Sequence, residues 1–354
     1  MPIPPIPAKS VVAFGHTSSP ELRKALEEIR EAIILPSYLS EDQRRKIYSS
    51  AWKARLEREP VTLAIDDDVH SFQYRDYLDL PNTNLKVKRA LRAMKTRRDF
   101  LNLEPLLEGV CKHAGRKLDP AFYPEAVRRA ARAGALDIVL DCALLAKRTG
   151  FRLDKHETVA QLMTWVQREA VFSGWDKKEL KKALKRIQWM LEQMEGDPEH
   201  MERRKPDSEP LLAYPLYRDP IFLAARLHLE AALAIKYGNG VDEEGDIAKH
   251  ANQLMQLWPE TADLISLHPP QAYTGNVALR YLLHKEAFVW ITSPVLNGLR
   301  LAARVVEPKL AEELEKRASV LEKQIDEAIK ESVGGRGEEL HQKLLEGLGE
   351  PATA

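Results

Sequence analysis

Apolar side chains recur every third or fourth residue along most of the chain, and this spacing predicts amphipathic helices. The first helix begins at Ser19 and Pro20, because serine caps a helix and proline suits its first position. Its apolar stripe comprises Leu22, Leu26, Ile29 and Ile33. A second helix begins at Ser40, which forms a capping-box pattern with Gln43.

The segment between residues 60 and 80 has a different pattern, in which apolar and smaller or polar residues alternate. The apolar positions are Val61, Leu63 and Ile65, followed after three aspartates by Val69, Phe72 and Tyr74. A period of two is typical of β-strands. We therefore expect at most one small β-hairpin, near residues 60–75, in a fold that is otherwise all-α.

Residues 84–194 contain one helix after another, with a period of 35 residues. The positions that match at this offset include Gly115 with Gly150, Leu118 with Leu153, and Asp119 with Asp154. A fixed period of this length indicates stacked supersecondary units. Each unit is predicted to be a helical hairpin, such as residues 122–132 followed by a turn at Gly134 and residues 136–148.

The repeat resembles the pentatricopeptide repeat, in which a 35-residue unit carries A-x-A-G between its helices and ends in aspartate. The residues that carry the resemblance are the run Ala-Arg-Ala-Gly-Ala-Leu-Asp at 131–137, with Ala143, Gly150 and Asp154. The resemblance covers about two and a half units, from residue 84 to 195. It implies a solenoid of pentatricopeptide-like or tetratricopeptide-like hairpins, and it implies an organellar protein that works on RNA or ribosomes in the mitochondrial matrix.

Members of that family read RNA bases through the fifth and the last position of each unit. If Asp119 and Asp154 close units, the fifth positions of the next units are Pro124 and Val159. Neither side chain can hydrogen-bond a base edge. The resemblance therefore implies the scaffold of the family without its sequence-specific reading of RNA.

The C-terminal half is predicted to be a separate helical lobe. Asp219 and Pro220 begin its first helix, residues 276–290 and 295–306 are expected to form a helical pair, and Pro308 begins a long polar helix. The expected organisation is an extended N-terminal arm (1–18), N-terminal helices with the short hairpin (19–81), helical repeats (82–195), a linker (196–215), a C-terminal helical domain (216–333) and a flexible tail (334–354).

The net charge of the chain is zero, with 53 Lys and Arg against 53 Asp and Glu, but basic and acidic residues are concentrated in different segments. A net charge of zero excludes a protein that coats nucleic acid with its whole surface. Residues 82–134 nevertheless contain 13 basic and 5 acidic residues, whereas residues 307–354 contain 7 basic and 12 acidic ones. This asymmetry favours a partner that binds in one orientation.

Two basic stretches are candidates for contact with RNA phosphates, the alternative for each being a solvated face that keeps the protein soluble. The first comprises Lys86, Lys88, Arg89, Arg92, Lys95, Arg97 and Arg98. The second comprises Lys178, Lys181, Lys182 and Lys185. Such contacts add affinity without sequence preference.

The sequence contains no pattern that predicts catalysis, a cofactor or a metal ion. It has no glycine-rich phosphate loop, no HExxH and only two cysteines, Cys111 and Cys142. His113, His156, His228, His250 and His284 occur singly, and a lone helical histidine is usually a packing or surface residue. No stretch is apolar enough to span a membrane. Residues 1–20 contain one lysine, no arginine and no acid, and their prolines oppose a leader helix.

These observations predict a non-catalytic helical scaffold without cofactor or small-molecule substrate. The chain is also similar in character to fungal mitochondrial ribosomal or ribosome-associated proteins, so we expect partners in a large assembly such as the mitochondrial ribosome, with some RNA backbone contact. The alternatives are a tetratricopeptide-like adaptor that binds proteins without RNA, and a factor for mitochondrial RNA maturation or stability.

Overall fold

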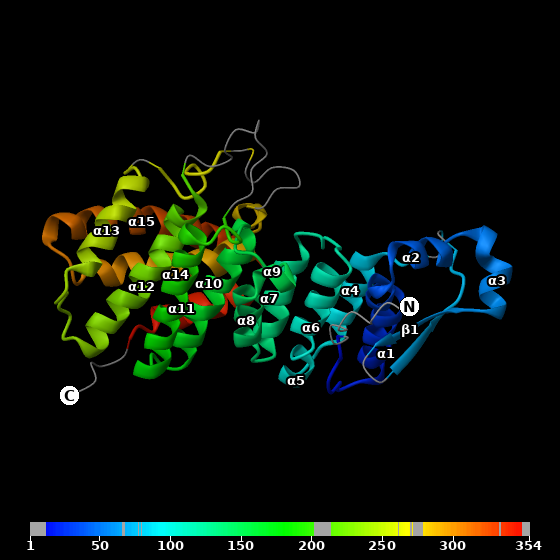
Figure 1. The fold of residues 1–354 in the computed structure, drawn as a ribbon. Coiled ribbons are helices and arrows are strands. Elements are labelled where there is room, and N and C mark those ends of the chain that lie inside the picture. Colours follow the sequence, from blue (N-terminus) through cyan, green and yellow to red (C-terminus); the bar gives the residue numbers. More distant parts are fainter. Residues whose placement is uncertain are drawn as a thin grey trace. The chain divides into compact units, whose positions relative to one another are not determined.

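The fold is almost wholly helical, with one two-stranded sheet among the residues described (Figure 1), which confirms the expected all-α class. The computed structural model describes residues 12–65, 68–76, 78, 80–201, 214–260, 262–269, 271, 279–332 and 334–348. The chain divides into two compact units, residues 1–151 and 152–354.

Unit 1 contains short helices, the sheet and then helical hairpins. Its elements are α1 (Pro20–Ile29), α2 (Glu41–Ile47), α3 (Lys53–Arg58), β1 (Val61–Ile65), β2 (Asp68–Phe72), α4 (Thr83–Ala93), α5 (Arg97–Phe100), α6 (Leu103–Glu108), α7 (Phe122–Arg132), α8 (Leu136–Leu144) and α9 (Ala146–Thr149). Helix α1 begins as predicted, with the Ser19 hydroxyl accepting the Leu22 amide at 3.2 Å. Helix α2 begins with the predicted capping box of Ser40 and Gln43.

The β-hairpin helps to enclose a small apolar core of its own. Strands β1 and β2 pair antiparallel, with Val61 opposite Phe72. The buried side chains of this core are Leu35, Leu39, Ile47, Leu56 and Phe72. The hairpin therefore covers the short N-terminal helices, and burial on one face is what fixes its register.

The described part of the N-terminal arm lies on α5 and the residues beside it. The Ser18 amide and hydroxyl both donate to the Asp99 carboxylate at 2.7 Å, and the Gly15 amide donates to Asn102 Oδ1 at 2.7 Å. The amides of Lys95 and Thr96 also donate to Asp99, which is fully buried. Ser18 is thus held by the Asp99 carboxylate and Gly15 by the Asn102 amide, while residues 1–11 of the expected arm lie outside the described residues.

The first helix of the predicted hairpin, α7, has the expected bounds of residues 122–132, whereas the expected second helix at 136–148 is divided at Leu145 into α8 and α9. Gly115 and Gly150 each follow the second helical segment of a hairpin, and both have positive φ, +62° and +69°. A left-handed residue at this position ends a helix, and glycine adopts it without steric cost. The two glycines therefore occupy equivalent turns, as the 35-residue offset predicts.

Unit 2 is built around the long helix α14. Its helices are α10 (His156–Phe172), α11 (Lys177–Gly196), α12 (Pro220–Tyr237), α13 (Asp246–Leu257), α14 (Lys285–Ala303), α15 (Pro308–Glu331) and α16 (Arg336–Leu345). Helix α14 packs against α12, α15 and α16, and α10, α11 and α12 lie side by side (Figure 1). Asp219 caps α12 as predicted, accepting the Ile221 amide at 2.9 Å.

Glycine permits the closest helix contacts in unit 2. A Cβ on Gly298 of α14 would lie 2.8 Å from the His228 Cβ of α12. A Cβ on Gly337 of α16 would lie 2.7 Å from the Glu286 carbonyl oxygen of α14. Both distances are shorter than atoms tolerate, so these contacts require residues without a side chain.

Helix α14 corrects the predicted pair of helices at residues 276–290 and 295–306. The structure has one helix from residue 285 to 303 that continues through Pro294, and residues 272–278 lie outside the described part of the chain. Proline removes one backbone donor and normally breaks a helix. Here the hydroxyls of Thr292 and Ser293 each donate to the carbonyl four residues earlier, at 2.7 Å, and packing on α12, α15 and α16 surrounds the helix.

The chain divides between residues 151 and 152, within the region expected to form helical repeats, and residues 202–213 of the expected linker lie outside the described residues. The segment expected to be a flexible tail contains α16, whose Leu340 and Leu344 are buried. The apolar face of α16 orders this segment because it packs on α14.

Candidate nucleic-acid interface

Four cations of the first basic stretch, on α4 and α5, form ion pairs with acids elsewhere in unit 1. Lys86 pairs with Glu28 of α1. Lys88 Nζ lies 2.9 Å from Asp119 Oδ2, Arg92 Nε lies 3.2 Å from Glu125 Oε1, and Arg97 Nη2 lies 2.6 Å from Asp137 Oδ2. Arg97 also donates to the Gly134 carbonyl at 3.0 Å. These cations therefore connect neighbouring helices.

The paired acids are held in their charged form. The hydrogen bond from Lys88 lowers the pKa of Asp119, and the hydrogen bonds from Arg97 lower the pKa of Asp137. A carboxylate that keeps its charge keeps its cation, so a phosphate at this surface must compete with an internal partner. Surface ion pairs of this kind contribute about 0–1 kcal/mol each to stability, so a phosphate can replace the acidic partner at a small cost in free energy.

The remaining cations of this stretch are exposed. Arg89 acts electrostatically on Glu28. The side chains of Lys95 and Arg98 have no ion-pair partner among the residues that the structure describes. The first stretch thus presents three cations without an ion pair among the described residues, rather than the seven that the sequence predicts as phosphate contacts.

The second basic stretch, on α11, is arranged differently. Lys178, Lys181, Lys182 and Lys185 are all exposed. Only Lys182 has an acidic partner within the described chain, Glu179 at 3.2 Å. We call Lys178, Lys181 and Lys185 the lysine face. The lysine face presents three ammonium groups without an ion pair in the described chain, on successive turns of one helix and about 4.5 and 6 Å apart along its axis.

The lysine face exists because α11 buries its opposite side. Leu180, Ala183, Ile187 and Met190 of α11 are buried, and α11 packs on α10 and α12. At its start, the Asp176 carboxylate accepts the amides of Lys178 and Glu179 at 2.9 and 3.1 Å. The cap and the apolar stripe fix which side of the helix is exposed, and the lysines occupy that side.

The positions that would read bases in a pentatricopeptide protein are not accessible. Pro124 and Val159 are buried in α7 and α10. Asp119 is paired with Lys88, and Asp154 Oδ2 accepts from Arg152 at 3.0 Å. None of these four side chains is therefore free to hydrogen-bond a base edge.

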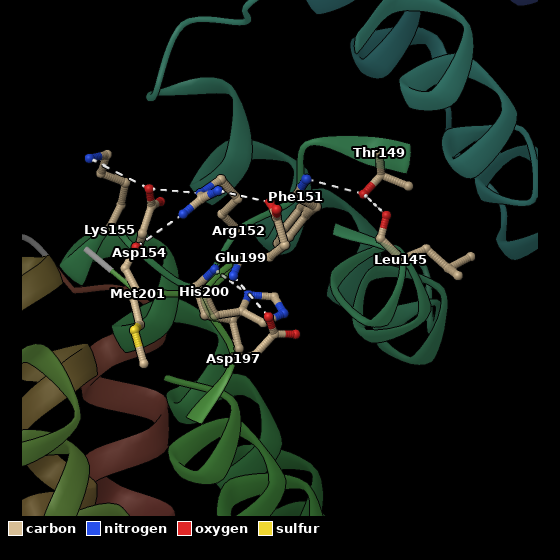
Figure 2. Close-up of polar contacts among 11 residues, drawn as sticks. Leu145, Thr149, Phe151, Arg152, Asp154, Lys155, Asp197, Glu199, His200 and Met201 are labelled. Atoms are coloured by element: carbon tan, nitrogen blue, oxygen red, sulfur yellow. Dashed lines mark hydrogen bonds and ion pairs between the residues drawn. The ribbon is translucent and has the colours of Figure 1, made fainter. Parts of the chain in front are cut away.

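Figure 2 shows the surroundings of Asp154. Arg152 lies between Asp154 and Glu199, with its Nη1 3.1 Å from Glu199 Oε2, and it also donates to the Met201 carbonyl at 3.0 Å. The Leu153 amide donates to His200 Nδ1 at 3.0 Å. These contacts hold the chain before α10 against the residues that follow α11, which is a structural role.

Sequence reasoning missed a cluster of His156, Asp219 and His268 in unit 2. Their ligand atoms lie within 4.8 Å of one another, and all three side chains are buried. They come from the start of α10, the N-cap of α12 and the segment after α13. Because 63 and 49 residues separate Asp219 from the two histidines, no local spacing indicates the cluster.

The cysteines are not activated. Burial raises the pKa of the Cys111 thiol to about 11, although a hydrogen bond with Tyr123 opposes the shift. Burial also raises the pKa of Cys142. Both thiols are therefore protonated at neutral pH and are poor nucleophiles.

None of the described helices is both long and apolar enough to cross a bilayer.

Comparison with known proteins identifies a family over nearly the whole chain. The family model of the mitochondrial ribosomal protein mS27 matches residues 4–346. The small ribosomal subunit protein mS27 of Neurospora crassa is 38% identical over 353 residues, covering 95% of this chain and 89% of that protein. These matches confirm the expected mitochondrial ribosomal protein and its similarity to fungal ones. The chain belongs to the mS27 family of mitochondrial ribosomal proteins.

Proposed function

We propose that this chain is a non-catalytic structural protein of the small subunit of the mitochondrial ribosome, in the mitochondrial matrix. Its partners are other ribosomal proteins and the backbone of ribosomal RNA. The similarity to the small-subunit protein of Neurospora crassa supports the assignment to that subunit. The alternatives of a free adaptor or an RNA maturation factor have no comparable support.

The absence of activated side chains among the described residues supports a role without catalysis. Both thiols have raised pKa values and are protonated at neutral pH.

The lysine face of α11 is the observation that carries the RNA contact. Lys178, Lys181 and Lys185 are exposed and unpaired within the described chain, whereas Lys88, Arg92 and Arg97 already have acidic partners. A phosphate that approaches α11 displaces only water and counterions. The release of counterions makes such binding favourable and dependent on salt.

The test compares two variants that remove the same charge. One is K178A/K181A/K185A, and its matched control is K88A/R92A/R97A. Each is added to small subunits from cells depleted of the protein, and the dissociation constant is measured over a range of KCl concentrations. Circular dichroism verifies that both variants keep their helices.

We expect the α11 variant to bind more weakly and its salt slope to fall by about two to three, at roughly 0.7–0.9 per lost phosphate contact. The control is expected to change the slope by less than about one. An unchanged slope in the α11 variant would contradict the proposed contact. Loss of a neighbouring protein without loss of RNA affinity would instead identify the lysine face as a surface for acidic side chains.

A further inference from the structure

The buried cluster of His156, Asp219 and His268 has the geometry of a metal site. Nε2 of His156 and Nε2 of His268 each lie 3.0 Å from the same oxygen, Asp219 Oδ2. Asp219 and His268 are at most 1% exposed, and His156 is 4% exposed. Three ligand atoms from three separate segments thus converge on one point that water does not reach.

The hydrogen bonds of His268 call for a positive charge between its ring and Asp219, either a proton on Nε2 or a metal ion. Its Nδ1 lies 3.1 Å from the Leu264 carbonyl oxygen, which only accepts, so Nδ1 carries a hydrogen. In a neutral ring Nε2 then has a lone pair, which faces the negatively charged Asp219 Oδ2. This contact is repulsive unless a proton or a metal ion lies between the two atoms. A carbonyl that holds Nδ1 in this way is the usual partner of a metal-bound histidine.

The surroundings of the cluster are suited to a buried ion. The Asp219 Oδ1 atom accepts the Ile221 amide, and Oδ2 faces the two histidines. The ring centroids of Phe222 and Tyr281 lie 4.6 and 5.6 Å from the centroid of the His156 ring. The hydroxyl of Tyr281 is buried and makes no hydrogen bond with the described residues. It is a candidate for the fourth ligand.

We propose that His156, Asp219 and His268 bind one Zn²⁺ ion. Two imidazoles and one carboxylate are a donor set that zinc prefers, whereas calcium and magnesium prefer oxygen alone. The ion joins the start of α10, the N-cap of α12 and the segment at residues 262–269. Because the three segments are far apart in sequence, the binding energy stabilises the fold of unit 2.

The first test uses the full chain, purified without chelators. We expect mass spectrometry of the metals to find about one zinc per chain, and we expect Zn²⁺ at 100 times its Kd to raise the Tm of the metal-free protein by roughly 5 °C. Co²⁺ in place of zinc should give the visible absorption of a four-coordinate site. Absence of zinc, together with no change in Tm and no cobalt absorption, would overturn the proposal.

The second test compares H156Q and H268Q with H250Q. His250 is also buried and also pairs with a carboxylate, Glu230 at 2.7 Å, but it is not part of the cluster. We expect H156Q and H268Q to lose the zinc and the thermal shift, and H250Q to keep both. Zinc that persists in H156Q and H268Q would show that it binds elsewhere. If these variants do not fold, the cobalt spectrum of the unmodified chain still decides the question.

Discussion

At the scale of single residues, burial sets the charge of several polar side chains. Asp99 is fully buried, which acts to raise its pKa, but the hydrogen bonds from Ser18, Thr96 and Lys95 outweigh this and lower it. The carboxylate therefore stays charged and holds the N-terminal arm. His228 shows the opposite outcome. Burial lowers its pKa to about 4, so its ring is neutral at physiological pH.

His228 gives a prediction about the pH dependence of stability. Its two ring nitrogens lie 2.8 and 3.0 Å from the side-chain amides of Gln167 and Asn297, and the neutral ring donates to one of them, so His228 connects α12 to α10 and α14. The unfolded chain binds a proton near pH 6.5, but the folded chain resists protonation until about pH 4. Stability must therefore fall as the pH decreases from 6.5 towards 4, by about 2 to 3 kcal/mol from this residue.

The measurement is the free energy of unfolding in urea at pH 7.5 and pH 4.5, for the unmodified chain and for H228Q. Other groups contribute to both chains and cancel in the comparison. We expect H228Q to lose about 2 to 3 kcal/mol less than the unmodified chain over this range. An equal loss in both would mean that His228 does not resist protonation.

At the scale of elements, the close contact of α14 with α12 gives a second prediction. A methyl group on Gly298 would collide with His228 and with the Ala224 carbonyl oxygen, 3.3 Å away. We expect G298A to destabilise the protein by roughly 1–3 kcal/mol, because an overpacked interface forces the helices apart.

The matched control is G196A. Gly196 is the last residue of α11, its φ is not positive, and nothing lies within 4 Å of a Cβ placed there. Alanine favours the helix at such a position, so G196A should be neutral or slightly stabilising. Urea unfolding measures both. If G298A is no less stable than G196A, the helices are not packed as closely as described.

Elements were predictable where their signals are local. The caps at Ser19, Ser40 and Asp219 follow from side chains within three residues, and the turn at Gly150 follows from the repeat. Helix α14 was not predictable, because its continuation through Pro294 depends on packing against other helices. The same holds for α16, whose burial depends on α14.

For the candidate interface, the sequence predicts only where basic residues are concentrated. The sequence indicates both basic stretches but not their pairing, because the partners of Lys88 and Arg97 lie 31 and 40 residues away. The first stretch has more cations than the second, but it also has more ion pairs, so the second stretch is the better candidate for RNA contact. The His156, Asp219 and His268 cluster had no sequence signal, because its members are too far apart to form a motif.

At the scale of the whole molecule, the chain has no net charge, but the cations without an ion pair are distributed unevenly among the described residues. Ion pairs neutralise much of α4 and α5, whereas the lysine face of α11 is exposed and unpaired among the described residues. This distribution supports the proposal that the chain contacts RNA through a limited patch and uses its remaining surface for protein contacts. We therefore propose that Lys178, Lys181 and Lys185 contact ribosomal RNA in the small subunit.

Chemical acylation of lysines tests this contact with RNA. The extent of modification at each lysine is measured by mass spectrometry in the free chain and in the assembled small subunit. We expect Lys178, Lys181 and Lys185 to be reactive in the free chain, protected in the subunit, and reactive again after ribonuclease treatment. Lys88, whose amine is already bonded to Asp119, should change little. Equal reactivity of the three α11 lysines in the free chain and in the subunit would contradict the account.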